Sequence, residues 1–382
     1  MKPKKNICIV TWFGSPNFGT NLQAFALCEF LKKNSYGVKI ISQLPPFSDK
    51  EKLLQYYLFK FKPYRVWLRI KRLFHKGNES FYTHFFGNPA INRWVRSNLK
   101  PTILNFPHEI RQLVKKTDCF ITGSDQVWNT YVRFDPTMFL NFAKTKKKIS
   151  YASSIGTKNI NPIFKDEVKK LLLQFSHISM RESLGALALQ KLLNSNEIAS
   201  VIDPTLLLSQ QEWISFCHPY RKFPSQNKSY IFCYLIGNNK NYEQTIRDIW
   251  KRSKIDNLII VPSCENPNFS VYGSNFARNI SPPEFVWLLN NAKLICTDSF
   301  HATALSINLR KQFVELLRFS DTDETSQNSR IHSILGHYNL NNQLYKEGTT
   351  NWLKEIDYTA VHKILNDDRG KAISWLLNSI EN

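Results

Sequence analysis

Residues 292–307, which read AKLICTDSFHATALSI, decide the fold class of this chain. The first five form a short apolar run that predicts a buried strand, and residues 302–307 predict a helix. A strand that passes through polar residues into a helix places those residues at the carboxyl edge of an α/β sheet, where such folds bind ligands. His301 is therefore a candidate for acid–base chemistry or anion binding, and a capping or packing role is the open alternative.

The same strand–loop–helix pattern recurs on both sides of this stretch, which predicts two parallel sheets. The apolar runs expected to form the first sheet are residues 7–12, 38–41, 119–122, 149–152, 178–180 and 201–202. Those expected to form the second sheet are residues 230–235, 258–261, 294–297 and 313–316. Helical spacing of apolar residues occurs between these runs at 22–33, 242–251, 283–290 and 329–335.

We therefore predict an α/β fold with two Rossmann-like domains that face a cleft. The first domain is expected to cover residues 1–203, because Asp203-Pro204-Thr205 breaks the pattern, and the second to cover residues 204–345. Residues 346–382 are expected to form a C-terminal helix or helices that cross back to the first domain. A helical insertion is predicted at about residues 46–112 of the first domain.

Residues 51–100 of this insertion are unusually basic and aromatic. They hold eleven Lys or Arg against two acidic residues, together with twelve aromatic residues. Basic residues beside Trp and Phe on a helix suit the interface of an anionic membrane. In the alternative interpretation, the aromatic side chains pack on the sheet while the charges face water. Nucleic acid is the partner that this region favours least.

Composition limits the class of protein further. The chain has 382 residues, a formal net charge of +21 and a pI of about 9.6, which together indicate an anionic partner. Its seven cysteines form no CxxC pair, which argues for reduced thiols and against a metal site. The apolar run near the N-terminus is too short for a signal peptide, and no run reaches the ~18 residues of a membrane span. We expect a cytoplasmic protein, with binding to the inner membrane face as an option.

The loop after the first predicted strand carries candidate anion ligands. Gly19 lets a ligand approach the backbone closely, and the start of the next helix offers unpaired NH groups to a phosphate or carboxylate. An ordinary helix cap is the alternative. The spacing differs from GxGxxG, which disfavours a dinucleotide cofactor. The donor-binding candidates in this loop are Asn17, Gly19, Thr20 and Asn21.

Three further strands end in polar residues. Asp125 in the turn GSDQVWN, residues 123–129, is a candidate to orient an acceptor hydroxyl or accept its proton, with a simple Asx-turn as the alternative. Arg181, after the strand at 178–180, offers a planar fork to phosphate or carboxylate, unless it forms a salt bridge with Glu182. Trp128 is able to stack on a sugar face. The acceptor-binding candidates are Ser124, Gln126, Trp128 and Ser154.

In their order and sequence, these motifs resemble the polysaccharide pyruvyl transferase family. The matching segments are residues 17–27, 123–129, 151–156, 179–183, 203–205 and 297–301. The resemblance implies a fold similar to the two-domain glycosyltransferase type B, no cofactor, and phosphoenolpyruvate as the donor substrate. It also implies that Arg181 and His301 serve the donor. Some members of the family carry Arg at the position of Ser299, and here that contact would have to come from Arg330 or a lysine.

The expected function is a transferase that places a pyruvate ketal on a sugar of a cell-surface polysaccharide or its lipid-linked precursor. We expect His301 to act as acid or base, Arg181 to bind the donor and Asp125 to position the acceptor, with Ser299 and Arg330 as further donor-binding residues. Two alternatives stay open at this point. The first is a glycosyltransferase that uses a nucleotide sugar, and the second is a non-catalytic basic docking module.

Overall fold

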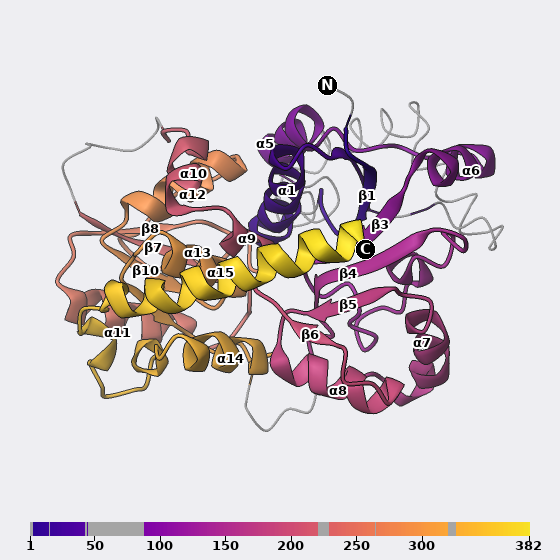
Figure 1. The fold of residues 1–382 in the computed structure, drawn as a ribbon. Coiled ribbons are helices and arrows are strands. Elements are labelled where there is room, and N and C mark those ends of the chain that lie inside the picture. The colour runs from indigo at the N-terminus through magenta and orange to yellow at the C-terminus, as the bar shows by residue number, and fades with distance from the viewer. Residues whose placement is uncertain are drawn as a thin grey trace.

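The computed structural model describes residues 3–14, 16–42, 44, 88–220, 229–263, 265–319 and 326–382, and these ranges contain two parallel β-sheets (Figure 1). The first sheet has the order β2-β1-β3-β4-β5-β6, formed by β1 (Asn6–Val10), β2 (Gly37–Ile41), β3 (Cys119–Thr122), β4 (Lys147–Ser153), β5 (His177–Met180) and β6 (Ala199–Ser200). The second has the order β11-β10-β7-β8-β9, formed by β7 (Tyr230–Tyr234), β8 (Asn257–Ile260), β9 (Asn275–Phe276), β10 (Leu294–Thr297) and β11 (Phe313–Glu315). The two sheets confirm the predicted fold class of two Rossmann-like α/β domains.

The strand order fixes where a ligand site can open. Strands β3, β7 and β10 are buried at every residue, as expected for parallel strands that helices cover on both faces. In the first sheet the order reverses between β1 and β3, and in the second it reverses between β10 and β7. Crevices open beyond the carboxyl ends of strands at such reversals. The loops after these four strands are therefore the expected place for a site.

Helices connect and cover the strands. Those of the first domain are α1 (Phe18–Lys33), α5 (Pro89–Trp94), α6 (Pro107–Lys116), α7 (Lys165–Leu172) and α8 (Ser183–Leu193). In the chain, α9 (Pro204–Leu207) and α10 (Gln210–Phe216) come between the strands of the first sheet and those of the second. The second domain and the C-terminal segment contain α11 (Tyr242–Ser253), α12 (Pro282–Asn291), α13 (Phe300–Asn308), α14 (Ser329–His337) and α15 (Tyr358–Glu381).

One apolar core continues across the junction of the two domains. Helix α1 of the first domain packs on α9, α12 and α13. At this contact the ring of Phe18 stacks on Phe285, with the ring centroids 4.3 Å apart, and meets Tyr234 edge to face. Because these rings are buried from both sides, apolar packing holds α1, and the loop before it, against the second domain.

The C-terminal helix α15 runs across both domains, as the yellow ribbon in Figure 1 shows. It packs on α13 of the second domain, on α9, and on β4 of the first sheet. At its far end, Lys5 donates a hydrogen bond from Nζ to the carbonyl oxygen of Ile380 at 2.8 Å. The helix therefore ties the two ends of the chain together over the junction.

Several elements differ from the sequence-based expectation. Strand β9 has only two residues, both exposed, so no apolar pattern marks it. Helix α9 starts with Pro204 directly after the cap residue Asp203, a start signal that the sequence analysis took for a domain boundary. The domain boundaries themselves stay a prediction. Residues 45–87, which include most of the basic, aromatic segment, lie outside the described residues, whereas α5 and part of α6 fall within the predicted insertion.

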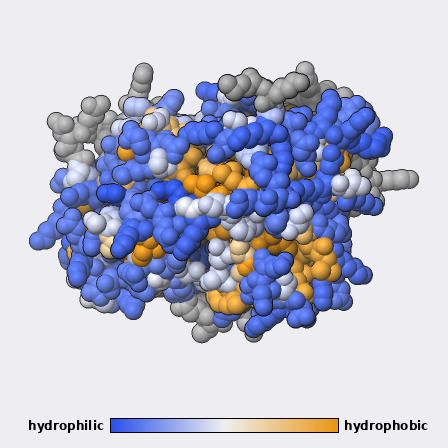
Figure 2. Space-filling view, viewed as in Figure 1, coloured by the Kyte–Doolittle hydropathy of each residue, from blue (hydrophilic) through white to orange (hydrophobic). Residues whose placement is uncertain are grey.

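The face of the molecule drawn in Figure 2 is largely hydrophilic where its residues are coloured. Figure 2 shows apolar atoms gathered in the lower right of that face, over the region of α8, where Leu184 and Leu187 are 47% and 51% exposed. Across the described ranges, the helices lack the combination of length and apolar character that crossing a membrane requires.

Candidate active site

A cavity of about 710 Å³ lies between the carboxyl edges of the two sheets. Its first wall comes from residues after β1 and β3 and from the start of α1, and its second wall from residues after β7, β10 and β11 and from α14. This is the place that the reversals in strand order predict. The lining includes Trp12, Phe13, Asn17, Thr20, Asp125 and Gln126 on the first wall, and Gly237, Ser299, His301, Arg318 and Arg330 on the second.

His301 lies in the first turn of α13 and is 6% exposed. Its Nε2 atom is 3.5 Å from Oδ2 of Asp203, longer than a good hydrogen bond, and has no hydrogen-bond partner among the described residues. The Nδ1 side of the ring lies against Gly19, where an added Cβ would come within 2.4 Å of Nδ1. The imidazole is therefore held between a carboxylate of the first domain and the backbone of α1.

Replacing Gly19 with alanine is expected to displace the imidazole of His301 and to lower turnover by about tenfold or more, because small displacements of a catalytic group are costly. The helix itself should tolerate the change, since alanine favours helix more than glycine does. Steady-state kinetics together with a thermal melt would measure both effects. Wild-type turnover in a normally folded Gly19→Ala protein would contradict the tight packing of His301 on α1.

Asp203 is the centre of the buried polar network. Its Oδ2 accepts a hydrogen bond from Oγ of Ser124 at 2.9 Å and lies 3.2 Å from Nη1 of Arg181. Its Oδ1 accepts hydrogen bonds from N and Oγ1 of Thr205 at 2.9 and 2.8 Å. Burial alone would raise the pKa of Asp203, but the charges of His301 and Arg181 outweigh this and lower it. Asp203 is therefore ionised at neutral pH beside the imidazole.

Arg181 is fully enclosed and stacks on the ring of Phe300, with Cζ 4.1 Å from the centroid. Its Nε donates to Glu182 at 2.8 Å, and its Nη1 lies 3.2 Å from Asp203 and 3.8 Å from Asp125. Burial lowers the pKa of Arg181, and these three carboxylates more than reverse that effect. Arg181 is not among the residues that line the cavity. Arg181 and His301 both approach the same anion in this structure, which is the carboxylate of Asp203.

Asp125 lines the cavity and faces Thr20 of α1. Its Oδ2 accepts a hydrogen bond from Oγ1 of Thr20 at 2.9 Å, and its Oδ1 accepts one from N of Gln126 at 2.9 Å. Burial raises its pKa, whereas His301, Arg181 and a hydrogen bond from Thr20 lower it, and the net shift is downward. Asp125 is thus an ionised carboxylate, within a cavity, that is able to accept a hydroxyl hydrogen bond.

The predicted anion loop is used mainly for capping. The side chain of Asn17 accepts hydrogen bonds from the N atoms of Gly19 and Thr20, so the first NH groups of α1 are already engaged. Asn21 donates from Nδ2 to the carbonyl oxygen of Asn17 and accepts from N of Gly14, and it is buried. Asn17 and Thr20 still line the cavity, whereas Gly19 packs against the ring of His301.

Of the acceptor-binding candidates, the structure places only Gln126 in the cavity lining. Its Nε2 donates to Oε1 of Gln327 across the cavity at 2.8 Å. Trp128 points into the core, where Nε1 donates to the carbonyl oxygen of Met138 and the ring stacks on Phe139. Ser124 and Ser154 are fully buried and hold the turn, because the former bonds to Asp203 and the latter accepts from N of Gly156.

The sequence analysis missed two cavity residues that its own rule could have found. Trp12 lies two residues after β1 and Arg318 three residues after β11, so both stand near carboxyl ends of strands. The donor-binding candidates Ser299 and Arg330 do line the second wall.

Glu315 is a further buried carboxyl group, at the end of β11, and it accepts a hydrogen bond from the hydroxyl of Thr303. Burial raises its pKa well above the ordinary value, so its proton stays on in the folded protein. The unfolded chain loses that proton above about pH 4.3, and Glu315 therefore costs stability as pH rises. Relative to wild type, Glu315→Gln should gain up to about 1.4 kcal/mol per pH unit between pH 5.5 and 7.5. Urea denaturation across this range would show it, and a difference that does not change with pH would contradict it.

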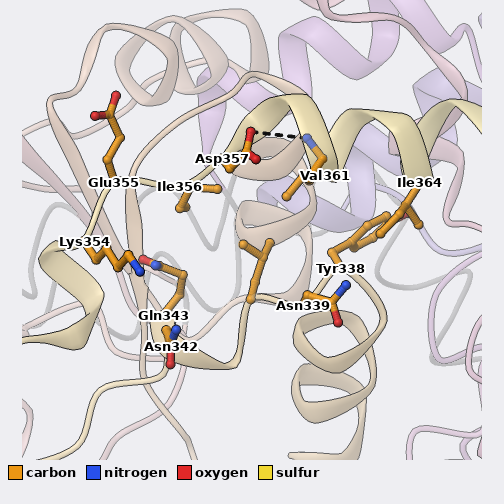
Figure 3. A pocket seen from close by; sticks show the side chains of 12 residues that line it. Tyr338, Asn339, Asn342, Gln343, Lys354, Glu355, Ile356, Asp357, Val361 and Ile364 are labelled. Atoms are coloured by element: carbon orange, nitrogen blue, oxygen red, sulfur yellow. Dashed lines mark hydrogen bonds between the residues drawn. The ribbon is translucent and has the colours of Figure 1, made fainter.

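A smaller cavity of about 280 Å³ lies between the end of α14 and the start of α15 (Figure 3). Tyr338, Gln343 and Ile364 point toward it, whereas Asp357 caps α15 with hydrogen bonds to backbone NH groups. None of the predicted site residues lines it. The candidate active site is therefore the interdomain cavity.

Two parallel-sheet domains around a cavity that holds a histidine, ionised carboxylates and arginines define a two-domain α/β protein with a candidate active site between its sheets. The model of the polysaccharide pyruvyl transferase family matches residues 17–317, and the chain belongs to this family. This finding confirms the resemblance seen in the sequence motifs.

Comparison with solved structures gives distant matches. UDP-GlcNAc 2-epimerase from Neisseria meningitidis, bound to UDP-GlcNAc, is 13% identical with a TM-score of 0.48, and the match covers 98% of this chain and 99% of the epimerase. An α-glucosyltransferase in complex with UDP and DNA is 9% identical with a TM-score of 0.49, with coverage of 99% and 100%. At this distance the matches carry no argument about activity. No curated protein shows significant similarity to the chain.

Proposed function

We propose that this transferase moves pyruvate from phosphoenolpyruvate onto two hydroxyls of one sugar in a cell-surface polysaccharide or its lipid-linked precursor. The observation that supports this best is the contact of His301 with the ionised Asp203 at the wall of a cavity that also holds Asp125. A buried carboxylate beside an imidazole holds the ring in one orientation. Membership in the pyruvyl transferase family supports the reaction class.

The chemistry requires one proton donor and one proton acceptor. His301 donates a proton to the methylene carbon of phosphoenolpyruvate while a sugar hydroxyl attacks C2 and gives its proton to Asp125. A second hydroxyl then attacks C2, the bond from C2 to the phosphate oxygen breaks, and phosphate leaves with the electron pair and takes up the proton held by Asp125. The proton of this second hydroxyl returns to His301. The ketal and phosphate are the two products, and no oxidant or reductant is needed.

The two walls of the cavity differ in character, which supports separate places for the two substrates. The second wall carries His301, Arg318 and Arg330 and suits the anionic donor. The first wall carries Trp12, Phe13 and carboxylates and suits a neutral sugar, since aromatic faces and carboxylates bind sugar rings and hydroxyls. Attachment to an anionic membrane through residues 51–100 stays a prediction, because residues 45–87 lie outside the described ranges.

The direct test is to incubate the protein with phosphoenolpyruvate and a panel of lipid-linked oligosaccharides. The proposal expects phosphate release that depends on an acceptor, together with a pyruvate-sized mass gain on that acceptor. Transfer from a nucleotide sugar without such release would instead identify a glycosyltransferase. Salt-sensitive binding of polyanions with neither reaction would identify a docking module.

A further inference from the structure

Two guanidinium groups, those of Arg318 and Arg330, line the second wall of the cavity. Arg330, in the first turn of α14, is 5% exposed. Its side-chain hydrogen bonds to described residues run to Gln327, from Nη2 to Oε1 at 2.9 Å and from Nε to O at 3.3 Å. Among the described residues, no carboxylate lies within ion-pair distance of Arg330. Glu265 is the acidic residue on this wall, and it too forms no ion pair with residues that the structure describes.

The environment of Arg330 disfavours its own charge. Burial lowers its pKa, and the positive charges of Arg181 and Arg318 lower it further, to about 9. The side chain is still protonated at neutral pH, so the cavity holds a buried cation that forms no ion pair with a carboxylate of the described residues. Such a charge is costly unless an anion binds beside it.

Arg318 is held in place by Asp298 at the end of β10. Its Nε donates to the carbonyl oxygen of Asp298 at 2.9 Å, and Nε lies 3.5 Å from Oδ2 of the same residue. The carboxylate of Asp298 also accepts hydrogen bonds from N of Ile236, N of Gly237 and the hydroxyl of Tyr242, each at 2.7 Å. These bonds fix the guanidinium through Nε alone. Nη1 and Nη2 form no hydrogen bond to any described residue and are available to a ligand in the cavity.

We propose that Arg318 and Arg330 form a subsite for the phosphate group of the donor. This inference rests on the proposed function and extends it, because it assigns the phosphate to the two arginines of the second wall and so places the enol carbons between these arginines and His301. Two guanidinium groups from different elements suit a tetrahedral dianion, whereas one guanidinium is enough to satisfy a planar carboxylate. Some family members carry a positive charge at the position of Ser299. In this chain the subsite supplies that charge from the loop after β11 and from α14.

Calorimetry with inorganic phosphate as the probe tests the subsite without turnover. Arg318→Gln and Arg330→Gln should each weaken phosphate binding at least about tenfold, because each removes charge-assisted hydrogen bonds. Arg247→Gln is the matched control, since it removes the same charge from the exposed face of α11 and should leave phosphate affinity within about twofold. Circular dichroism checks the fold of each variant. If Arg330→Gln unfolds, Arg318→Gln, whose side chain is partly exposed, decides the question.

The outcomes separate the subsite from the proposed function. Unchanged phosphate affinity in Arg318→Gln, or no phosphate binding by wild type at millimolar concentrations, would overturn the subsite. If phosphate binding depends on both arginines but phosphoenolpyruvate is not consumed with any acceptor, the subsite stands and the pyruvyl transfer is wrong. If phosphoenolpyruvate is consumed and neither arginine variant changes its KM, the function stands and the subsite is wrong.

Discussion

Replacing His301 with glutamine is expected to lower kcat for pyruvyl transfer by about 10²- to 10⁴-fold while the protein stays folded. Glutamine has a similar reach and still offers an NH to Asp203, but it cannot give a proton to the methylene carbon. Because the arginines of the second wall are unchanged, binding of phosphoenolpyruvate should fall much less than turnover. Acceptor-dependent phosphate release at saturating donor, with donor binding measured by calorimetry, separates the two effects.

The matched control is His337→Gln on α14, which removes an exposed imidazole paired with Asp368, outside the cavity lining. It should leave kcat within about twofold. If His301→Gln kept wild-type turnover and lost donor affinity instead, His301 would be a binding residue and the acid–base assignment would be wrong.

The sequence predicted the positions of the site better than the orientation of its side chains. A polar residue at the carboxyl end of a parallel strand lies at the sheet edge regardless of other details, which is why His301 and Asp125 do line the cavity. Whether a side chain points into the cavity or into the core depends on tertiary packing, which the local sequence pattern does not show. Trp128 stacks on Phe139 in the core, whereas Trp12, which no motif marked, lines the first wall.

The local sequence pattern also did not predict that Asp203 contacts Arg181 and His301. The sequence analysis took Asp203-Pro204-Thr205 for a domain boundary, whereas in the structure Asp203 caps α9 by accepting a hydrogen bond from N of Thr205. Its contacts with Arg181 and His301 join residues that lie 22 and 98 positions away in the chain, and only the tertiary packing of α9 on α1 and α13 brings them together. A single sequence offers no signal for such a pairing.

Arg181→Met is expected to destabilise the protein by about 3–5 kcal/mol at neutral pH, the typical cost of removing one partner from a buried ionic network. The variant leaves the carboxylates of Asp125, Glu182 and Asp203 close together without their shared cation. Methionine fills most of the volume and keeps contact with Phe300, so the loss reflects charge more than packing. Urea denaturation at pH 7 measures it.

The pH dependence of this loss distinguishes a structural cation from a donor ligand. In wild type the pKa values of Asp125 and Asp203 are lowered, so their contribution to stability is present above about pH 4 and is lost as pH falls. Without Arg181 both pKa values should rise, and protonation on going from pH 7 toward pH 5 should shrink the gap between variant and wild type. Arg247→Met on α11, which breaks an exposed pair with Glu243, should cost less than about 1 kcal/mol at any pH. A different result would be a loss of less than about 1 kcal/mol in Arg181→Met together with abolished donor binding. Arg181 would then be a donor ligand, as the sequence motif alone suggests. The proposed phosphate subsite would in that case have to include a third guanidinium group beside those of Arg318 and Arg330.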